Sequence, residues 1–213
     1  MSQTKLQIYN GALRLLEERK LSSLSENREP RRVLDDIWDE GAIDACLEMG
    51  LWNFATRSVK AEYSPSVEPP FGLAFAFDKP TDWIQTAAVC YDAHYTTPCI
   101  QYVDEAGYWF ADVDTLYIKY VSNLNTYGAD LSLWPQSFAK MVQAYMALEA
   151  VGRITGNKTD RQVVEREFNL RLSAARNKDA MNEPTKFPAV GSWVGSRGSS
   201  GRGDRGYRNR LIG

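Results

Sequence analysis

The segment from Arg28 to Ala55 constrains the fold most strongly, because it combines helical periodicity with a closing run of aromatic residues. Apolar or small side chains recur at helical spacing, and Pro30 stands where the first turn of a helix tolerates proline. These positions are Val33, Leu34, Ile37, Trp38, Gly41, Ala42, Ala45, Cys46 and Met49. We therefore expect one amphipathic helix over residues 31–50, about 30 Å long, followed by Trp52 and Phe54 as apolar anchors.

The polar face of this expected helix is strongly acidic. In a continuous helix, Asp36, Glu40 and Asp44 lie on one i, i+4 line, with Asp35 and Asp39 beside it. Most such runs are solvated faces, but this one is also suited to meet arginines of a neighbouring copy or to line a negatively charged passage. Catalytic use would need shifted pKa values, which an exposed run of like charges does not itself create. The five carboxylates are candidates for a subunit interface or channel face.

Helical and strand-like patterns follow one another along the rest of the chain. A first helix is expected over residues 4–18 with Thr4 or Ser2 as its N-cap, a third from Trp134-Pro135 to Ile154, and a fourth from Thr159 until Pro184 ends it. Residues 57–123 are rich in β-branched, aromatic and turn residues, which is typical of strands. The expected strands are Ser58–Tyr63, Leu73–Phe77, Trp83–Tyr91, Cys99–Val103, Tyr108–Phe110 and Thr115–Val121.

Together these patterns predict an α+β fold that is mainly α. Residues 1–56 and 132–183 are expected to form a four-helix bundle from two N-terminal and two C-terminal helices. Residues 57–131 are expected to form an antiparallel β insertion, with a hairpin turn at Asp104–Gly107. Residues 184–213 are expected to be a flexible, extended Gly/Arg-rich arm, because they cannot bury enough apolar surface to offset the entropy of ordering.

Charge is distributed unevenly between the arm and the rest of the chain. Residues 191–213 hold five arginines against Asp204, so they carry +4, which leaves −6 on the other residues of a chain whose net charge is −2. The arm is suited to order on a protein partner, to bind nucleic-acid phosphates, or to act as a solubilising end. Leu211 and Ile212 favour a protein groove, since phosphate binding does not need apolar side chains.

Several functional classes have no support in the sequence. It holds no P-loop, no GxGxxG after a strand and no HExxH motif. His94 is the only histidine, and the three cysteines show no CxxC spacing, so we expect no catalytic, metal or cofactor site. No apolar run approaches the ~20 residues of a membrane span, and the N-terminus lacks the regions of a signal peptide. We expect synthesis in a cytoplasm and no association with a membrane.

A set of motifs, taken together and in order, resembles a known family. The YNGAL-LL first helix, the SL-E-REPRR link, the LDDIWDEG helix and the LWNFA end are similar to the opening of the head-to-tail adaptor (connector) proteins of tailed bacteriophages. That family includes tail tubular protein A of short-tailed phages. FAFDKPTDW, DTLYIKYVSN and LWPQSFAKMVQAYMALEAVGRITGNK resemble its later elements. The resemblance covers about residues 4–180 and is loosest in the β region.

The resemblance implies a structural protein of the virion rather than an enzyme. In that family the copies form a ring, usually dodecameric, beneath the portal protein at the head-tail interface. The ring is added after genome packaging, extends the DNA channel and gives the downstream tail protein, a nozzle or tail tube, its docking surface. Genomic DNA passes through without sequence-specific binding during ejection. The arm residues expected to bind the portal are Trp193, Arg197, Arg202, Arg205, Tyr207, Arg208, Arg210, Leu211 and Ile212.

Two other functional classes remain alternatives. A nucleic-acid-binding protein would use the basic arm, and its duplex binding would depend on salt and vanish without residues 191–213. A polysaccharide-degrading tail enzyme would carry its activity in the β insertion. Its turnover would be abolished by a change such as Asp112→Asn or Asp114→Asn.

Overall fold

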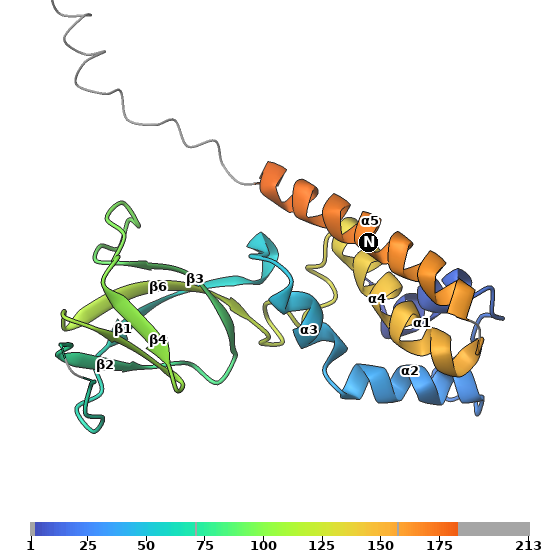
Figure 1. Cartoon of the computed structure of the whole chain (residues 1–213), viewed down its shortest axis with the longest axis horizontal. Coiled ribbons are helices and arrows are strands. Elements are labelled where there is room, and N and C mark those ends of the chain that lie inside the picture. The colour runs from blue at the N-terminus through green and yellow to red at the C-terminus, as the bar shows by residue number, and fades with distance from the viewer. Residues whose placement is uncertain (1–2, 71, 157, 183–213) are drawn as a thin grey trace, which may run out of the picture. The chain divides into compact units, whose positions relative to one another are not determined.

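The computed structural model describes residues 3–70, 72–156 and 158–182. Over these residues the chain forms five α-helices, one short 3-10 helix (η1, Asn53–Ala55) and six strands (Figure 1). The helices are α1 (Lys5–Leu15), α2 (Glu29–Asp39), α3 (Ala42–Glu48), α4 (Gln136–Ile154) and α5 (Lys158–Asn182). The strands are β1 (Thr56–Glu62), β2 (Phe75–Asp78), β3 (Trp83–Cys90), β4 (Tyr102–Glu105), β5 (Tyr108–Ala111) and β6 (Thr115–Ser122).

Helix α4 is the centre of the helical part and contacts each of the other four helices. Its sequence is apolar around most of its circumference, as expected for a helix surrounded by others. The ring of Phe138 on α4 packs edge-on against Trp52 and Trp134, with centroids 4.9 and 5.0 Å apart. The helical core therefore gathers the aromatic anchors around α4, and Trp52 is buried there as predicted.

Helix α1 begins as predicted. The Thr4 hydroxyl accepts a hydrogen bond from the Gln7 amide nitrogen at 3.3 Å, and the Gln7 side-chain oxygen accepts one from the Thr4 nitrogen at 3.0 Å. This reciprocal capping box satisfies backbone donors that the first turn leaves free. Of the two N-caps that the sequence allows, Thr4 is the one observed, and the helix ends at Leu15 rather than at residue 18.

The prediction of one continuous helix over residues 31–50 is wrong. The segment forms two helices, α2 and α3, separated at Gly41, whose φ is +99°. A left-handed backbone conformation costs little for glycine, and it ends one helix while redirecting the next. The acidic residues before and after Gly41 therefore do not lie along one helical line.

The strands form two three-stranded antiparallel sheets, with orders β1-β6-β3 and β2-β5-β4. All six predicted strands overlap an observed one. The predicted hairpin is confirmed between β4 and β5, where Ala106 and Gly107 both have positive φ, as a type I′ turn requires. The long β6 pairs on both sides, with β1 and β3, while β5 pairs with β2 and β4.

The predicted fold class is therefore wrong. In place of a four-helix bundle with a single β insertion, the described residues show a mixed fold of five helices and two separate antiparallel sheets. Two physical causes account for the difference. Gly41 divides the second predicted helix. The strands form two separate sheets because their pairing partners, some of them distant in the sequence, fall into two sets.

The sheets and the helices have distinct cores that meet at a few contacts. One core contains Trp109, Phe77 and Ile118 between the strands, and the other surrounds α4 but also includes Val121 of β6. The Gln85 side chain on β3 donates a hydrogen bond to the Gly50 carbonyl at 2.7 Å. Strand residues therefore help to hold the chain where it leaves α3.

Candidate functional site

A polar, cationic pocket lies between α1 and the first half of α4. Its volume is about 420 Å³, and its lining includes Arg14, Lys20 and Lys140 together with several side-chain amides. Among the described residues, no acidic side chain lines it. A pocket with positive groups at its rim and amide groups in its wall is suited to bind an anionic partner that also offers hydrogen-bonding groups.

The three cations have no ion-pair partner within the described part of the chain. Arg14, Lys20 and Lys140 are exposed, and no carboxylate of residues 3–70, 72–156 or 158–182 lies within ion-pair distance of any of them. Arg14 stands in the last turn of α1, where a positive charge is also favourable for the helix dipole. Three such cations beside one cavity leave a local positive field that an acidic partner would complement.

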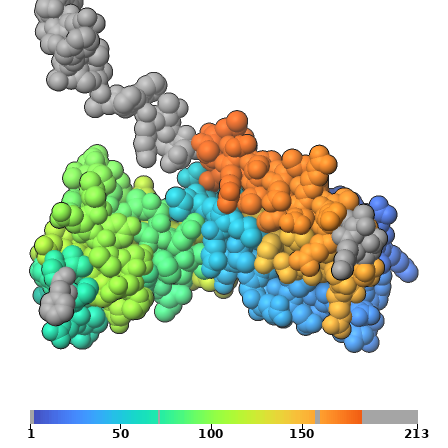
Figure 2. Space-filling view, viewed as in Figure 1, coloured from blue at the N-terminus to red at the C-terminus, as the bar shows by residue number. Residues whose placement is uncertain are grey.

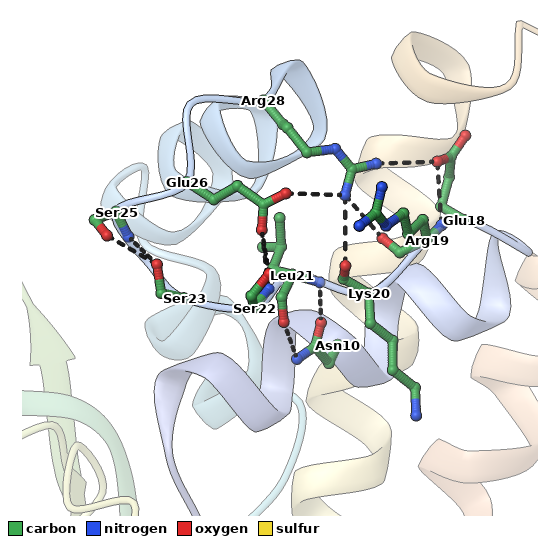
Figure 3. Close-up of polar contacts among 10 residues, drawn as sticks. All are labelled: Asn10, Glu18, Arg19, Lys20, Leu21, Ser22, Ser23, Ser25, Glu26 and Arg28. Carbon is green, nitrogen blue, oxygen red and sulfur yellow. Dashed lines mark hydrogen bonds and ion pairs between the residues drawn. The ribbon is translucent and has the colours of Figure 1, made fainter.

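The link between α1 and α2 holds Lys20 in place (Figure 3). The Asn10 amide accepts a hydrogen bond from the Leu21 nitrogen at 2.7 Å and donates one to the Leu21 carbonyl at 3.1 Å. Arg28 donates to the carbonyls of Arg19 and Lys20 at 3.2 and 3.5 Å. Figure 3 shows the Lys20 side chain extending away from these contacts. The backbone of Lys20 is therefore fixed, while its ammonium group takes no part in these hydrogen bonds.

Gln143 is the buried polar member of the pocket. Its side chain is only 6% exposed, and its Oε1 atom has no hydrogen-bond partner among the described residues. Within the same residues, the other buried side-chain atom without a partner is Arg31 Nε, which belongs to a guanidinium group already paired with Asp35. A buried amide oxygen without a donor costs about 1–3 kcal/mol, so removing this oxygen should stabilise the fold.

The packing of α1 on α4 explains where Gln143 lies. A Cβ atom on Gly11 would overlap the Gln143 side chain, so the glycine leaves the room that this side chain occupies. Beside it, the Gln3 amide donates to Gln136 Oε1 at 2.7 Å and ties the start of α1 to the start of α4. Gln143 is therefore held against α1 with its amide at the wall of the pocket.

The five predicted acidic residues fall into two groups. Asp35 is partly buried and paired within the chain: it accepts a hydrogen bond from the Tyr9 hydroxyl at 2.7 Å and pairs with Arg31 and with Lys5. Burial and this carboxylate both raise the pKa of Tyr9 above its usual range. On α3, Asp44 accepts a hydrogen bond from the Asn123 side chain at 3.2 Å. Each of these two carboxylates is already bonded to other residues of the chain, so the five acidic residues do not form one common face.

The remaining three acids, unlike Asp35 and Asp44, are exposed. Asp36, Asp39 and Glu40 are exposed at the C-terminal end of α2 and have no ion-pair partner within the described residues. Three negative charges within five residues repel one another and gain from an external cation. We call this group the acidic end of α2.

Helix α5 adds an apolar surface that the sequence analysis did not single out. Val163, Leu170 and Met181 are 65, 60 and 77% exposed, although the opposite side of the same helix buries Val164 and Phe168. Figure 2 shows this helix, in orange, on the surface of the molecule. A cavity of about 360 Å³ beside it is lined in part by Leu15, Val163 and Leu170. Exposed apolar groups that line a hollow mark a surface suited to contact another protein.

A contrasting polar cluster surrounds Asp82, just before β3. Its carboxylate accepts hydrogen bonds from Arg57 at 3.0 Å, from the Tyr120 hydroxyl at 3.2 Å and from the Ser122 hydroxyl. Burial alone would raise the pKa of Asp82, but the bonds from Ser122 and Arg57 outweigh it and leave the pKa below its usual value. Every group in this cluster has a partner within the fold, so the cluster is structural.

The other candidate residues from the sequence do not form a site within the described residues. Asp112 and Asp114 are exposed on the connection between β5 and β6. Over the three described ranges, no group of three His, Cys, Asp or Glu side chains is placed to hold a metal ion. None of the helices in these ranges is both long and apolar enough to cross a bilayer. The nine predicted portal-binding residues of the arm, Trp193 to Ile212, lie outside the described residues.

Sequence reasoning missed the pocket, although one signal for it was present. Gln143 is a lone polar residue inside the apolar run MVQAYMAL, and a polar side chain in such a position needs a partner. Arg14 and Lys140 gave no signal, because each stands on the wet side of its own helix. Only the packing of α1 against α4 brings them to one cavity.

Comparison of the sequence with protein-family models and with curated proteins finds no match.

Proposed function

We propose that this chain is a head-to-tail adaptor of a tailed bacteriophage. Its copies would form a ring, dodecameric as in the family it resembles, beneath the portal protein. The ring extends the DNA channel and offers a docking surface to the downstream tail protein. Its work is assembly rather than catalysis, and DNA passes through it without sequence-specific binding.

The observation that carries the proposal is the place of the family-like motifs in the fold. The YNGAL motif lies in α1, LDDIWDEG lies in α2 and the turn after it, LWNFA leads into β1, and the LWPQSFAKMVQ motif starts α4. Tyr9, Leu34, Trp52 and Phe138, one from each, are fully or almost fully buried in one core. The resemblance therefore concerns one packed unit rather than scattered short matches.

The exposed apolar side of α5 supports association with other copies. A folded monomer gains nothing from holding Val163, Leu170 and Met181 in water, whereas a neighbouring copy would cover them. In a closed ring each copy presents two different surfaces to its two neighbours, so an uncovered helix face is expected on the free chain.

The division of charge supports the path of DNA and the role of the arm. Residues 1–190 carry −6 and residues 191–213 carry +4. A negative wall repels phosphates and lets a duplex slide, while a basic arm with sparse aromatic and aliphatic residues is suited to fasten onto another protein. We therefore assign portal binding to the arm and ring contacts to the helices.

The experiment that tests this function is binding of the full chain to the assembled portal of the same phage, followed by electron microscopy. We expect a ring of adaptor density on the portal, and no ring for the truncation to residues 1–190. A full chain that does not bind the portal would contradict the adaptor function. A truncation that still binds would contradict only the role of the arm.

A matched pair of variants separates the ring contact from general surface effects. Val163→Asp with Leu170→Asp places two charges on the exposed side of α5 and is expected to prevent ring closure. Ile100→Asp is the control, because Ile100 is even more exposed, at 84%, but lies in the connection between β3 and β4. Rings that form normally with the α5 variant would show that this face is not a subunit contact.

A further inference from the structure

We propose that the pocket between α1 and α4 binds the acidic end of α2 from a second copy of the same chain. The contact joins two different surfaces, since neither Asp36, Asp39 nor Glu40 lines the pocket of its own chain. The inference rests on the proposed function in one respect, because a ring is what closes such a head-to-tail series of contacts.

Charge complementarity is the first argument. The pocket presents the cations Arg14, Lys20 and Lys140, and the acidic end of α2 presents three carboxylates. Like several other exposed charges of the chain, these three cations and three carboxylates have no internal ion-pair partner within the described residues, and they lie on two separate surfaces. Ion pairs formed across such a contact would relieve the repulsion within each group.

The buried amide of Gln143 is the second argument, and it is independent of charge. Its Oε1 atom is enclosed against α1 beside Gly11, so a ligand in the pocket meets this amide through its NH₂ group. An NH₂ group donates and needs an acceptor, and a carboxylate supplies one. The acidic end of α2 therefore brings the kind of group that this amide needs.

Nucleic-acid phosphates fit this pocket less well. Phosphate oxygens would accept hydrogen bonds from the cations as carboxylates do, but residues 1–190 carry −6, so a duplex would be repelled from most of the chain outside the pocket. A second copy meets the charge and the hydrogen-bonding requirements together.

The test uses two full-length variants with reversed charges. The pocket variant carries Arg14→Glu, Lys20→Glu and Lys140→Glu. The α2 variant carries Asp36→Lys, Asp39→Lys and Glu40→Lys. In each variant alone, the proposed contact between the pocket and α2 joins like charges, whereas in an equal mixture the pocket of one variant again meets opposite charges on the α2 of the other.

Self-association is measured by analytical ultracentrifugation at rising protein concentration in low salt. The wild-type chain is expected to associate, and each variant alone to associate at least about tenfold more weakly. The equal mixture is expected to regain association that neither variant shows alone. Raised salt should weaken the wild-type contact, because exposed ion pairs are screened over about 10 Å at 0.1 M. Circular dichroism and thermal unfolding establish that the variants are folded.

Several results would overturn the inference. These are a wild-type chain that stays monomeric, variants that associate normally, or folded variants whose mixture fails to recover. The control variant carries Glu68→Lys, Asp78→Lys and Glu105→Lys. It changes the net charge by the same amount as the α2 variant, but at exposed residues of the β region, and it is expected to associate normally. A pocket variant that loses portal binding but keeps self-association would assign the pocket to the portal and reject a second copy.

The outcome is separable from that of the proposed function. If rings form on the portal regardless of the pocket variant, the adaptor function stands and this contact is rejected. If the charge-reversed mixture recovers association but neither the wild-type chain nor any variant binds the portal, the contact stands and the adaptor function is rejected.

Discussion

Two polar clusters in the molecule differ in whether their hydrogen-bond and ion-pair partners lie within the fold. At Asp82, a buried carboxylate receives hydrogen bonds from Arg57, Tyr120 and Ser122, so all its requirements are met within the fold. In the pocket between α1 and α4, three cations have no such partners among the described residues, and the amide of Gln143 stands at the wall beside them. The first cluster stabilises the chain, and the second is available to another molecule.

The comparison gives a criterion for separating structural polar residues from binding residues. Burial alone does not distinguish them, because Asp82 and Gln143 are 7 and 6% exposed. Hydrogen-bond satisfaction does, since a buried polar group costs free energy only while it lacks a partner. Removing a satisfied group should therefore destabilise the fold, whereas removing an unsatisfied one should stabilise it and impair binding.

The largest expected effect is on the satisfied cluster. Asp82→Ala leaves Arg57 and the buried Tyr120 and Ser122 hydroxyls without their acceptor, and we expect a loss of about 3 kcal/mol in the free energy of unfolding. Urea unfolding followed by circular dichroism measures it. Asp78→Ala, an exposed acid at the end of β2, is the control and should change stability little. Equal stability of the two variants would show that the Asp82 cluster is not a structural centre.

The pH dependence of stability should reveal the same cluster, with a smaller effect. The pKa of Asp82 is lowered in the folded chain by Ser122 and Arg57, despite the opposing effect of burial. Its contribution is therefore present above the unfolded-state pKa, near 4, and is lost as pH falls through the lower folded-state value. The stability difference between wild type and Asp82→Ala should shrink on acidification below about pH 4. A difference that stays constant from neutral pH to about pH 2 would contradict this assignment.

The secondary structure of both regions was largely predictable, and the pairing between elements was not. Periodicity and turn residues are local, so they located α1, α4, α5 and all six strands. Gly41 stood in the predicted second helix as a visible signal for a break, but its helical neighbours outweighed it. The pairing of β6 with both β1 and β3, and of β5 with β2, depends on contacts between distant residues. Local patterns do not encode these contacts, so the division into two sheets was missed.

The two polar clusters were hidden from the sequence for the same reason. Asp82 follows a proline and a threonine in a turn-like stretch, and nothing local indicates that Arg57 and Tyr120 surround it. The acidic end of α2 was predictable, because exposed acids on one helix are close in sequence. Its cationic counterpart was not, since Lys20 and Lys140 meet only through packing of α1 on α4.

Removal of the Gln143 amide should have opposite effects on folding and on binding. Gln143→Met keeps the length of the side chain and removes the amide, so we expect the free energy of unfolding to rise by about 1 kcal/mol. Self-association should fall at the same time, since the contact loses a buried hydrogen bond. Gln136→Met is the control: its exposed amide already accepts from Gln3, and its loss should not stabilise the fold. A destabilised Gln143→Met chain would show that the amide has an internal role.

The smallest expected effect on stability belongs to the pocket cations, and it is the most informative about binding. Lys140→Gln removes an exposed charge that has no ion-pair partner among the described residues, so the free energy of unfolding should change by less than about 0.5 kcal/mol. Because the neighbouring α2 would lose one ion pair, self-association should weaken and depend less on salt, as sedimentation at two ionic strengths would measure. Lys60→Gln is the matched control, since Lys60 also lies on the surface but pairs with Glu62 on β1. An unchanged salt dependence in Lys140→Gln would mean that Lys140 meets no carboxylate in the assembly, and the pocket would then lose one of its three proposed ion pairs.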